Sequence, residues 1–179
     1  MEKRITLGDK TFELSITEKE IHEAVDRCAE SISADYADKN PVFVIVLNGA
    51  FLFASDLVRR VTCPCQIAFT KISSYQGTTS TYSVKEQLPV TEDVKGRHVI
   101  IVEDIVETGY SMDFLVQRLQ SFGPASVEIC ALSFKPDKCR IPELNIKYVG
   151  MKLPEAFIVG YGLDYNSMGR HLKDIYSLV

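Results

Sequence analysis

A short apolar run that leads directly into acidic residues is the feature that most constrains this chain. Residues 99–102 read Val-Ile-Ile-Val. Both alternating faces of this run are apolar, which is typical of a strand buried on both sides of a parallel sheet. Glu103 and Asp104 follow at once, so we expect them where the strand leaves the core. Ligands of open α/β sheets bind at that carboxyl edge, and the run therefore predicts an acidic ligand site there.

Small and hydroxyl-bearing residues follow the acids and precede a helical pattern. They are Thr108, Gly109, Tyr110 and Ser111. Backbone N–H groups beside a helix N-terminus can hold a phosphate group. Acidic groups next to such a cradle can hold ribose hydroxyls or a Mg²⁺ ion. Each piece alone is commonly a solvated loop or an ordinary turn, but their contiguous order favours a phosphate site.

Composition narrows the class of protein. The chain has 179 residues, of which 46% are hydrophobic and 25% charged, as in a soluble globular domain. Its net charge of −4 argues against nucleic acid or an anionic membrane as the main partner. Neither an apolar run long enough to span a bilayer nor a secretory signal is visible. We therefore expect a cytoplasmic protein.

The cysteines and histidines give no sign of a metal or nucleophile site. The five cysteines, at positions 28, 63, 65, 130 and 139, are odd in number and scattered, so we expect them to be reduced and mostly buried. The pair at 63 and 65 lacks the two-residue spacer of zinc motifs. The histidines at 22, 98 and 171 show no triad or metal spacing, and none is given a catalytic role.

Helical and strand patterns alternate along most of the chain. Thr17 and Glu20 form a capping box that begins a helix reaching about Tyr36. Further strands are expected at 42–47, 66–72, 99–102 and 126–134, with helices at 51–61 and 111–121. The alternation predicts an α/β fold with a mainly parallel central sheet and helices on both faces. We expect one domain over residues 1–179.

Three regions lie outside this alternation. Residues 5–16 suggest a short strand or a hairpin arm. The polar stretch at about 73–96 is too long for a passive connection and predicts a lid, within which 82–84 and 88–90 can pair as a hairpin. Beyond Asp137, short strands at 148–150, 157–162 and 175–179 predict a small hood subdomain, formed largely by residues 137–179, that caps the sheet.

The segment 99–111 closely resembles the phosphoribosyl-diphosphate signature of type I phosphoribosyltransferases. It matches at every position but one, because Glu107 stands where the family usually has Asp. The resemblance runs from about Thr17 to Val179 and narrows to the branch that acts on 6-oxopurines. It implies the α/β fold of that family and a requirement for Mg²⁺.

The resemblance also implies roles for residues on the phosphate side of the site. Glu103 and Asp104 would hold the ribose hydroxyls and the metal, and residues 108–111 the 5′-phosphate. Asn48 and Gly49 resemble the pyrophosphate loop, often entered through a non-proline cis peptide. Asn48 stands where some members have Lys, so only backbone contacts are implied there.

Further residues match the base side and the lid of the family. They are Ser74 and Tyr75 in the mobile lid, Lys135 as donor to the 6-oxo group, Phe157 stacking on the purine, Ile158 as a backbone contact, Asp164 as a Mg²⁺ ligand and Arg170 on pyrophosphate. Without the family, Phe157 reads as core, Asp164 as a turn residue and Lys135 as solvated.

The resemblance implies transfer of 5-phosphoribosyl from phosphoribosyl diphosphate to N9 of a 6-oxopurine, hypoxanthine and guanine among them. Glu107 would take or relay the purine N7 proton. A homodimer or homotetramer is expected. Two alternatives stay open at this point: a nucleotide-sensing regulator with the same fold, and an enzyme that uses xanthine or a pyrimidine base.

Overall fold

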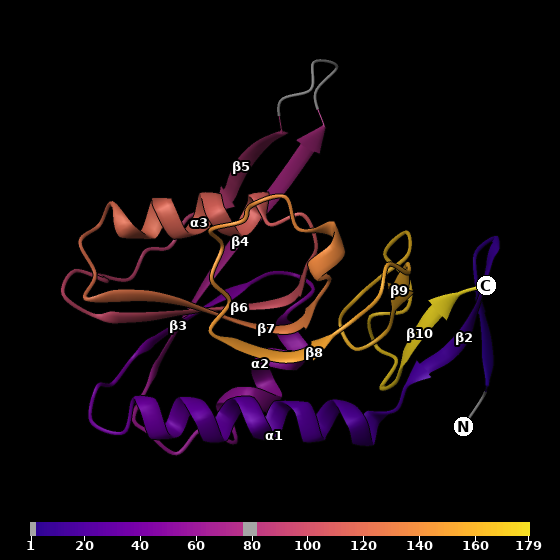
Figure 1. Cartoon of the computed structure of the whole chain (residues 1–179), viewed down its shortest axis with the longest axis horizontal. Coiled ribbons are helices and arrows are strands. Elements are labelled where there is room, and N and C mark those ends of the chain that lie inside the picture. Colours follow the sequence, from indigo (N-terminus) through magenta and orange to yellow (C-terminus); the bar gives the residue numbers. More distant parts are fainter. Residues whose placement is uncertain (1–2, 77–81) are drawn as a thin grey trace.

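A six-stranded sheet forms the centre of the molecule and confirms the expected α/β class (Figure 1). The computed structural model describes residues 3–76 and 82–179, for 74–76 and 82–83 the backbone alone. The strands lie in the order β5-β4-β3-β6-β7-β8. Their bounds are β3 (Val42–Val46), β4 (Gln66–Gln76), β5 (Tyr82–Leu88), β6 (His98–Val106), β7 (Ser126–Phe134) and β8 (Tyr148–Lys152).

The sheet is parallel except at one edge. β3 pairs in parallel with both β4 and β6, and β6, β7 and β8 continue the parallel ladder, whereas β5 is antiparallel to β4. The chain therefore runs from β3 outward to β4 and later returns to β6 on the other side of β3. Such a reversal between two neighbouring strands is where open α/β sheets bind ligands, at the carboxyl ends.

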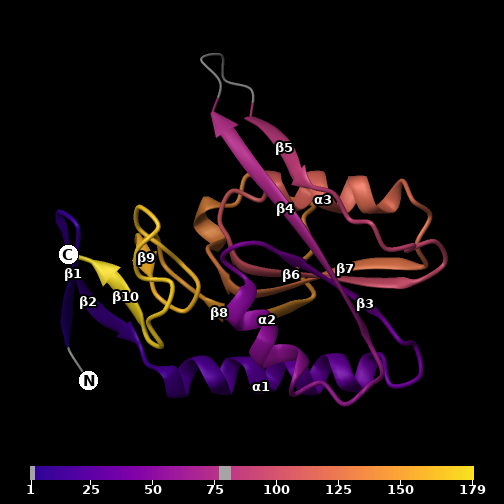
Figure 2. The ribbon, with the colours of Figure 1, turned by 180° about the vertical axis from the view of Figure 1, so that it is seen from behind.

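Helices cover both faces of this sheet, as expected. α1 (Glu18–Asp35) and α2 (Phe51–Val58) lie on one face and α3 (Tyr110–Gln120) on the other (Figures 1 and 2). The predicted capping box begins α1, since the Glu20 N–H donates to Thr17 Oγ1 and the Thr17 N–H donates to Glu20 Oε2. Among the described residues, no helix is both long and apolar enough to cross a membrane.

The hood is a second, four-stranded sheet, and half of it comes from the N-terminus. Its order is β1-β2-β10-β9, and every neighbouring pair is antiparallel. The strands are β1 (Arg4–Leu7), β2 (Lys10–Ile16), β9 (Ile158–Val159) and β10 (Ile175–Leu178). The expected N-terminal hairpin is thus confirmed, and its partner is the C-terminal strand. Alternation within residues 5–16 contained no information about that partner.

One short strand expected in the hood belongs to the central sheet. Residues 148–150 lie in β8, which pairs in parallel with β7, so assigning them to the hood was wrong. Tyr148 is buried against the cluster under α1. A side chain on Gly150 would lie 2.7 Å from the Leu132 carbonyl oxygen. The glycine therefore permits a close approach to β7 that the apolar pattern did not reveal.

The region expected as a lid is largely an antiparallel ribbon. β4 continues to Gln76 and pairs with β5, and this ribbon projects beyond the sheet (Figure 2). Residues 82–84 therefore pair with β4, so the predicted hairpin between 82–84 and 88–90 was wrong. Beyond this ribbon the chain packs on the core again, because Val94 is buried in the cluster under α3. Residues 77–81 of the expected lid lie outside the described residues.

Candidate active site

The turn after β3 packs directly on an acid of β6. The peptide bond between Leu47 and Asn48 is cis, as the resemblance implied. A side-chain carbon added to Gly49 would lie 1.8 Å from Asp104 Oδ2, so only glycine permits this approach. Gly162 of the hood, with φ +99°, would likewise place such a carbon 2.0 Å from the Gly49 carbonyl oxygen. Sheet edge and hood therefore meet through backbone at this point.

The two adjacent acids lie within β6 rather than beyond its end. Glu103 and Asp104 are each 8% exposed. The apolar run predicts a strand that ends at residue 102, but the parallel ladder with β7 continues to Val106. The Asp104 N–H donates to Glu103 Oε1 at 3.1 Å, and the Ile105 N–H donates to Asp104 Oδ1 at 2.8 Å.

Burial shifts the pKa values of these carboxyl groups upward. It raises the pKa of Asp104 and raises that of Glu103 well above its ordinary value, where the neighbouring Asp104 charge adds to the effect. Ionising both carboxyl groups is therefore unfavourable unless a cation binds beside them. Arg170 lies close enough to oppose part of the shift at Asp104.

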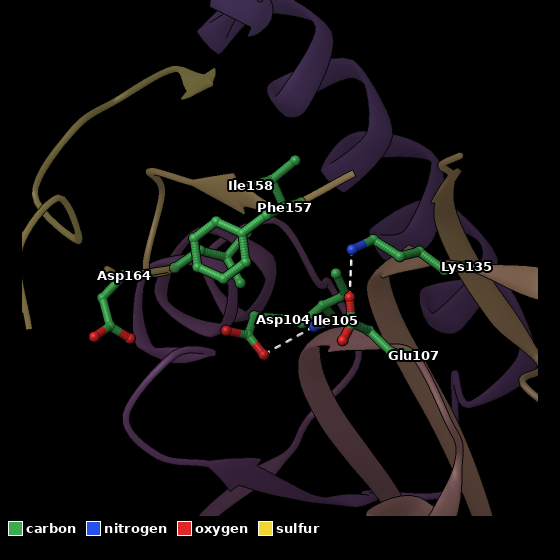
Figure 3. Close-up of a pocket in the computed structure, with 8 residues that line it drawn as sticks. Asp104, Ile105, Glu107, Lys135, Phe157, Ile158 and Asp164 are labelled. Carbon is green, nitrogen blue, oxygen red and sulfur yellow. Dashed lines mark hydrogen bonds and ion pairs between the residues drawn. The ribbon is translucent and has the colours of Figure 1, made fainter. Parts of the chain in front are cut away.

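A cavity of about 150 Å³ opens beside Asp104 (Figure 3). This volume is below the roughly 300–1,000 Å³ of pockets for drug-sized ligands and suits a smaller molecule. Its lining contains six of the predicted site residues together with two that the sequence did not suggest, Ile105 and Leu163. The lining residues are Asp104, Ile105, Glu107, Lys135, Phe157, Ile158, Leu163 and Asp164.

Lys135 and Glu107 form an ion pair in this cavity. Lys135 is only 2% exposed, and its Nζ donates both to Glu107 Oε1 and, at 2.5 Å, to the Ala156 carbonyl oxygen. An ammonium group has three N–H donors, so one is left for a ligand acceptor. Lys138 Nζ also lies 3.8 Å from Glu107 Oε1. Lys135 is therefore a buried, oriented donor and not the solvated residue that the isolated sequence suggested.

Phe157 presents an aromatic ring to the cavity. Phe157 is 47% exposed, although it directly precedes the buried strand β9 of the hood. Ile158 lies in β9 and pairs with Ser177 of β10, which fixes the backbone beside the ring. A half-exposed aromatic ring suits stacking on a flat base.

Asp164 and Arg170 form an ion pair at the hood side of the cavity. Arg170 Nη2 lies 2.6 Å from Asp164 Oδ1, and its Nη1 donates to the Gly162 carbonyl oxygen at 2.6 Å. The Ser167 N–H donates to Asp164 Oδ2 at 2.8 Å. The guanidinium therefore connects Asp164 to the glycine turn that rests on β3.

The small residues after Glu107 lead into α3, as predicted. Gly109 is the N-cap with φ +87°, and Tyr110 and Ser111 are the first residues of the helix. The space beside Gly109 is filled by side chains of the 139–144 segment, Leu144 among them. The Arg140 N–H donates to the Thr108 carbonyl oxygen at 2.9 Å. The loop is thus held from behind while its N–H groups lie at a helix N-terminus.

The acids fit a magnesium ion that is shared with a substrate rather than enclosed by protein. Within residues 3–76 and 82–179, no group of three or more His, Cys, Asp or Glu side chains converges on one point. Mg²⁺ usually retains water and takes one or two carboxylates together with substrate phosphates. Two buried carboxyl groups with raised pKa values, Glu103 and Asp104, match the need for an added cation.

The remaining predicted residues do not line this cavity. Asn48 and Gly49 are in the turn above Asp104, and residues 108–111 begin α3. Ser74 and Tyr75 are in β4, where it pairs with β5, and their side chains lie outside the described residues.

Comparison with known proteins agrees with this geometry. The family model for the phosphoribosyl transferase domain matches residues 15–166. The chain belongs to the phosphoribosyltransferase family. A hypoxanthine phosphoribosyltransferase from Haemophilus influenzae is 37% identical over 168 residues, covering 92% of this chain and 93% of the relative. A Staphylococcus aureus hypoxanthine-guanine phosphoribosyltransferase is 37% identical over 93% of both chains.

Solved structures agree in fold. The crystal structure of a hypoxanthine-guanine phosphoribosyltransferase from Bacillus anthracis, with HEPES in its active site, superimposes with a TM-score of 0.89 at 34% identity. The match covers 93% of this chain and 98% of that one. The family assignment made on the signature at 99–111 is thereby confirmed, and the chain is an enzyme of this family. The family model begins at residue 15, so β1 and most of β2 precede the matched range.

Proposed function

We propose that this phosphoribosyltransferase moves the 5-phosphoribosyl group of phosphoribosyl diphosphate to N9 of hypoxanthine or guanine. The products are the nucleoside 5′-monophosphate and pyrophosphate, and the role is purine salvage. The observation that carries the proposal is the cavity in which the free donor of Lys135 and the exposed ring of Phe157 lie beside Asp104. A donor and a stacking surface are what an oxopurine requires.

Substrate choice follows from the donor. Lys135 Nζ offers an N–H to an oxygen at purine C6, whereas the amino group of adenine would place two donors against each other. Mispairing a buried polar group costs about 1–3 kcal/mol. We therefore expect adenine to be a poor substrate. The Ala156 carbonyl, already bonded to Lys135, fixes where that donor points.

The protein's own groups position the substrates and balance charge. Backbone N–H groups of residues 108–111 hold the 5′-phosphate at the start of α3. The turn at Gly49 admits the diphosphate by close backbone approach. Glu103 and Asp104 hold the ribose hydroxyls, and Glu107 takes or relays the purine N7 proton. Positioning and charge neutralisation supply most of the rate in such a transfer.

Magnesium completes this scheme as a proposal. Glu103, Asp104 and Asp164 are the carboxylates that would hold it, in company with the diphosphate oxygens. When bound, the ion neutralises the leaving diphosphate. Arg170 would have to exchange its pairing with Asp164 for pyrophosphate in that state, and its guanidinium fork suits both partners.

The deciding experiment is transfer of radiolabelled bases with phosphoribosyl diphosphate, with and without Mg²⁺. Hypoxanthine, guanine, xanthine, adenine and a pyrimidine base form the panel. We expect transfer to hypoxanthine and guanine that stops when a chelator is in excess. Full activity in chelator would contradict the metal scheme, and equal rates for adenine and hypoxanthine would contradict the role of Lys135.

Self-association and a cytoplasmic location are further proposals. Ile67 and Phe69 are two residues apart in β4 and thus on one face of the strand. They are 43% and 47% exposed, and Phe51 at the start of α2 is 42% exposed. Exposed apolar side chains of this size are typical of protein interfaces. Light scattering after gel filtration separates monomer, dimer and tetramer.

A further inference from the structure

Three aromatic rings of the hood form a cluster behind the cavity. Phe12 of β2 is fully buried, and its ring centroid lies 6.3 Å from that of Phe157 and 6.2 Å from that of Tyr165. The Phe157 and Tyr165 rings are 6.0 Å apart and nearly perpendicular, at 86°. Edge-to-face and tilted pairs at such distances attract each other. The buried part of Phe157 therefore rests on two other rings.

The N-terminal hairpin holds this cluster from outside. Tyr165 Oη donates to Asp9 Oδ1 at 2.8 Å, and Lys10 Nζ lies 5.5 Å from the centre of the Tyr165 ring. Asp9 is in the turn that joins β1 to β2. The hairpin thus contacts Tyr165 by a hydrogen bond and by a cation over the ring.

The backbone of Phe157 is tied to the same strands. The Leu178 N–H donates to the Phe157 carbonyl oxygen at 2.9 Å, and Leu178 is the ladder partner of Phe12. The ring of Phe157 therefore contacts β2 directly, and its backbone is bonded to the strand that pairs with β2. The family model starts at residue 15, beyond Phe12.

We propose that Phe12 is a positioning residue for the base: it fixes the ring of Phe157 in the plane on which a purine stacks. The inference rests on the proposed function only for the identity of the ligand. A half-exposed ring without support must be ordered when the base binds, and ordering a side chain weakens binding. The phosphate loop at 108–111 contains none of these rings, so we expect the binding of phosphoribosyl diphosphate to depend less on Phe12 than the binding of the base does.

The test uses the full chain with two variants and a matched control. Phe12→Leu keeps an apolar side chain but removes the ring, and Tyr165→Leu removes the other ring at a partly exposed position. Leu14→Ala is the control, because Leu14 belongs to the same apolar cluster on β2 but has no ring. Melting temperatures, the KM for each substrate and the Kd of inosine 5′-monophosphate are measured for all four proteins.

Each ring variant is expected to raise the KM for hypoxanthine and the Kd of the nucleotide about tenfold, which corresponds to about 1.4 kcal/mol. The KM for phosphoribosyl diphosphate should stay within about twofold in Phe12→Leu, because the phosphate loop at 108–111 lies outside the ring cluster. Leu14→Ala should lower the melting temperature without moving the hypoxanthine KM. A purely structural role for Phe12 would give all three variants the same pattern.

The outcomes separate this inference from the proposed function. If the wild type transfers hypoxanthine and the Tyr165→Leu or folded Phe12→Leu protein keeps its KM, the positioning role is overturned while the function stands. If the wild type binds the nucleotide but does not transfer, the proposed function fails and the Kd values decide the positioning role. A wild type that binds no purine nucleotide overturns both.

Discussion

The ion pair between Lys135 and Glu107 has one buried and one accessible partner. The Lys135 side chain is 2% exposed and that of Glu107 is 39% exposed. Glu107 also has Lys138 at 3.8 Å, whereas Lys135 has, besides Glu107, the Ala156 carbonyl oxygen. We therefore predict that Glu107→Gln lowers the free energy of unfolding more than Lys135→Met does.

The magnitudes follow from which charge is left without a partner. Glu107→Gln leaves the buried ammonium of Lys135 without its charged partner. Breaking a buried pair costs about 3–5 kcal/mol, and the amide oxygen of Gln still accepts a hydrogen bond, so we expect about 3 kcal/mol. Lys135→Met leaves a carboxylate that water and Lys138 can stabilise, and it relieves the desolvation of the ammonium. We expect about 1 kcal/mol, mainly for the unpaired Ala156 carbonyl.

Thermal unfolding at pH 7 without ligands tests this order. For a domain of this size about 1 kcal/mol shifts the melting temperature by roughly 2–4 °C, so the expected losses are about 6–12 °C for Glu107→Gln and about 2–4 °C for Lys135→Met. The double variant should resemble Lys135→Met alone, because no buried charge remains. A Lys135→Met protein less stable than Glu107→Gln would refute the reasoning.

Three more predictions follow from the same geometry. Glu107→Gln should lower turnover by about 10²–10⁴-fold with little change in phosphoribosyl diphosphate affinity, and Glu107→Asp should keep much of the rate; unchanged turnover in the Gln variant removes the catalytic role. The pKa of Glu103 is raised above its ordinary value of 4.5 in the folded protein, so the free energy of unfolding falls as pH rises above 4.5 through the folded pKa. The melting temperature of Glu103→Gln should therefore rise relative to that of the wild type as pH rises. Parallel pH profiles of the two proteins would count against this. Gly162→Ala should cost about 3 kcal/mol, from positive φ and the clash with Gly49, against about 1 kcal/mol for the control Gly96→Ala, which has positive φ but nothing within 4 Å; equal losses in urea unfolding would contradict it.

Local patterns predicted the elements that form the frame of the site. Apolar runs located β3, β4, β6 and β7 of the parallel sheet, because a strand covered on both faces must be apolar on both. The capping box at Thr17 and Glu20 located the start of α1 through a bond between residues three apart. The helical pattern at 111–121 located α3, which begins one residue earlier, at Tyr110. In each case the information lies within a few residues of chain.

Contacts between segments far apart in the sequence could not be predicted from such local patterns. Glu107 and Lys135 meet only because β6 and β7 run in parallel with Val106 opposite Phe134. The family resemblance named both residues but gave no contact between them. Likewise, nothing near Phe12 in the sequence indicates that it supports Phe157, 145 positions away, because that contact depends on how β2 pairs with β10. Ladder register is a tertiary property, and alternation alone does not determine it.

The contact of Gly49 with Asp104 and Gly162 explains how the sheet and the hood can serve one reaction. Asp104 comes from β6, Gly49 from the turn after β3, and Gly162 from the hood turn that Arg170 holds. Gly162 packs on the backbone of Gly49, and Gly49 packs on the carboxylate of Asp104, so both glycines leave room that a side chain would fill. Under the proposed function, a base held by the hood and a phosphate-bearing group held at the sheet edge would be placed relative to each other through these contacts. Because transfer between two substrates depends on their relative placement to within an ångström or so, we expect glycine at positions 49 and 162 to matter to the reaction as well as the charged residues.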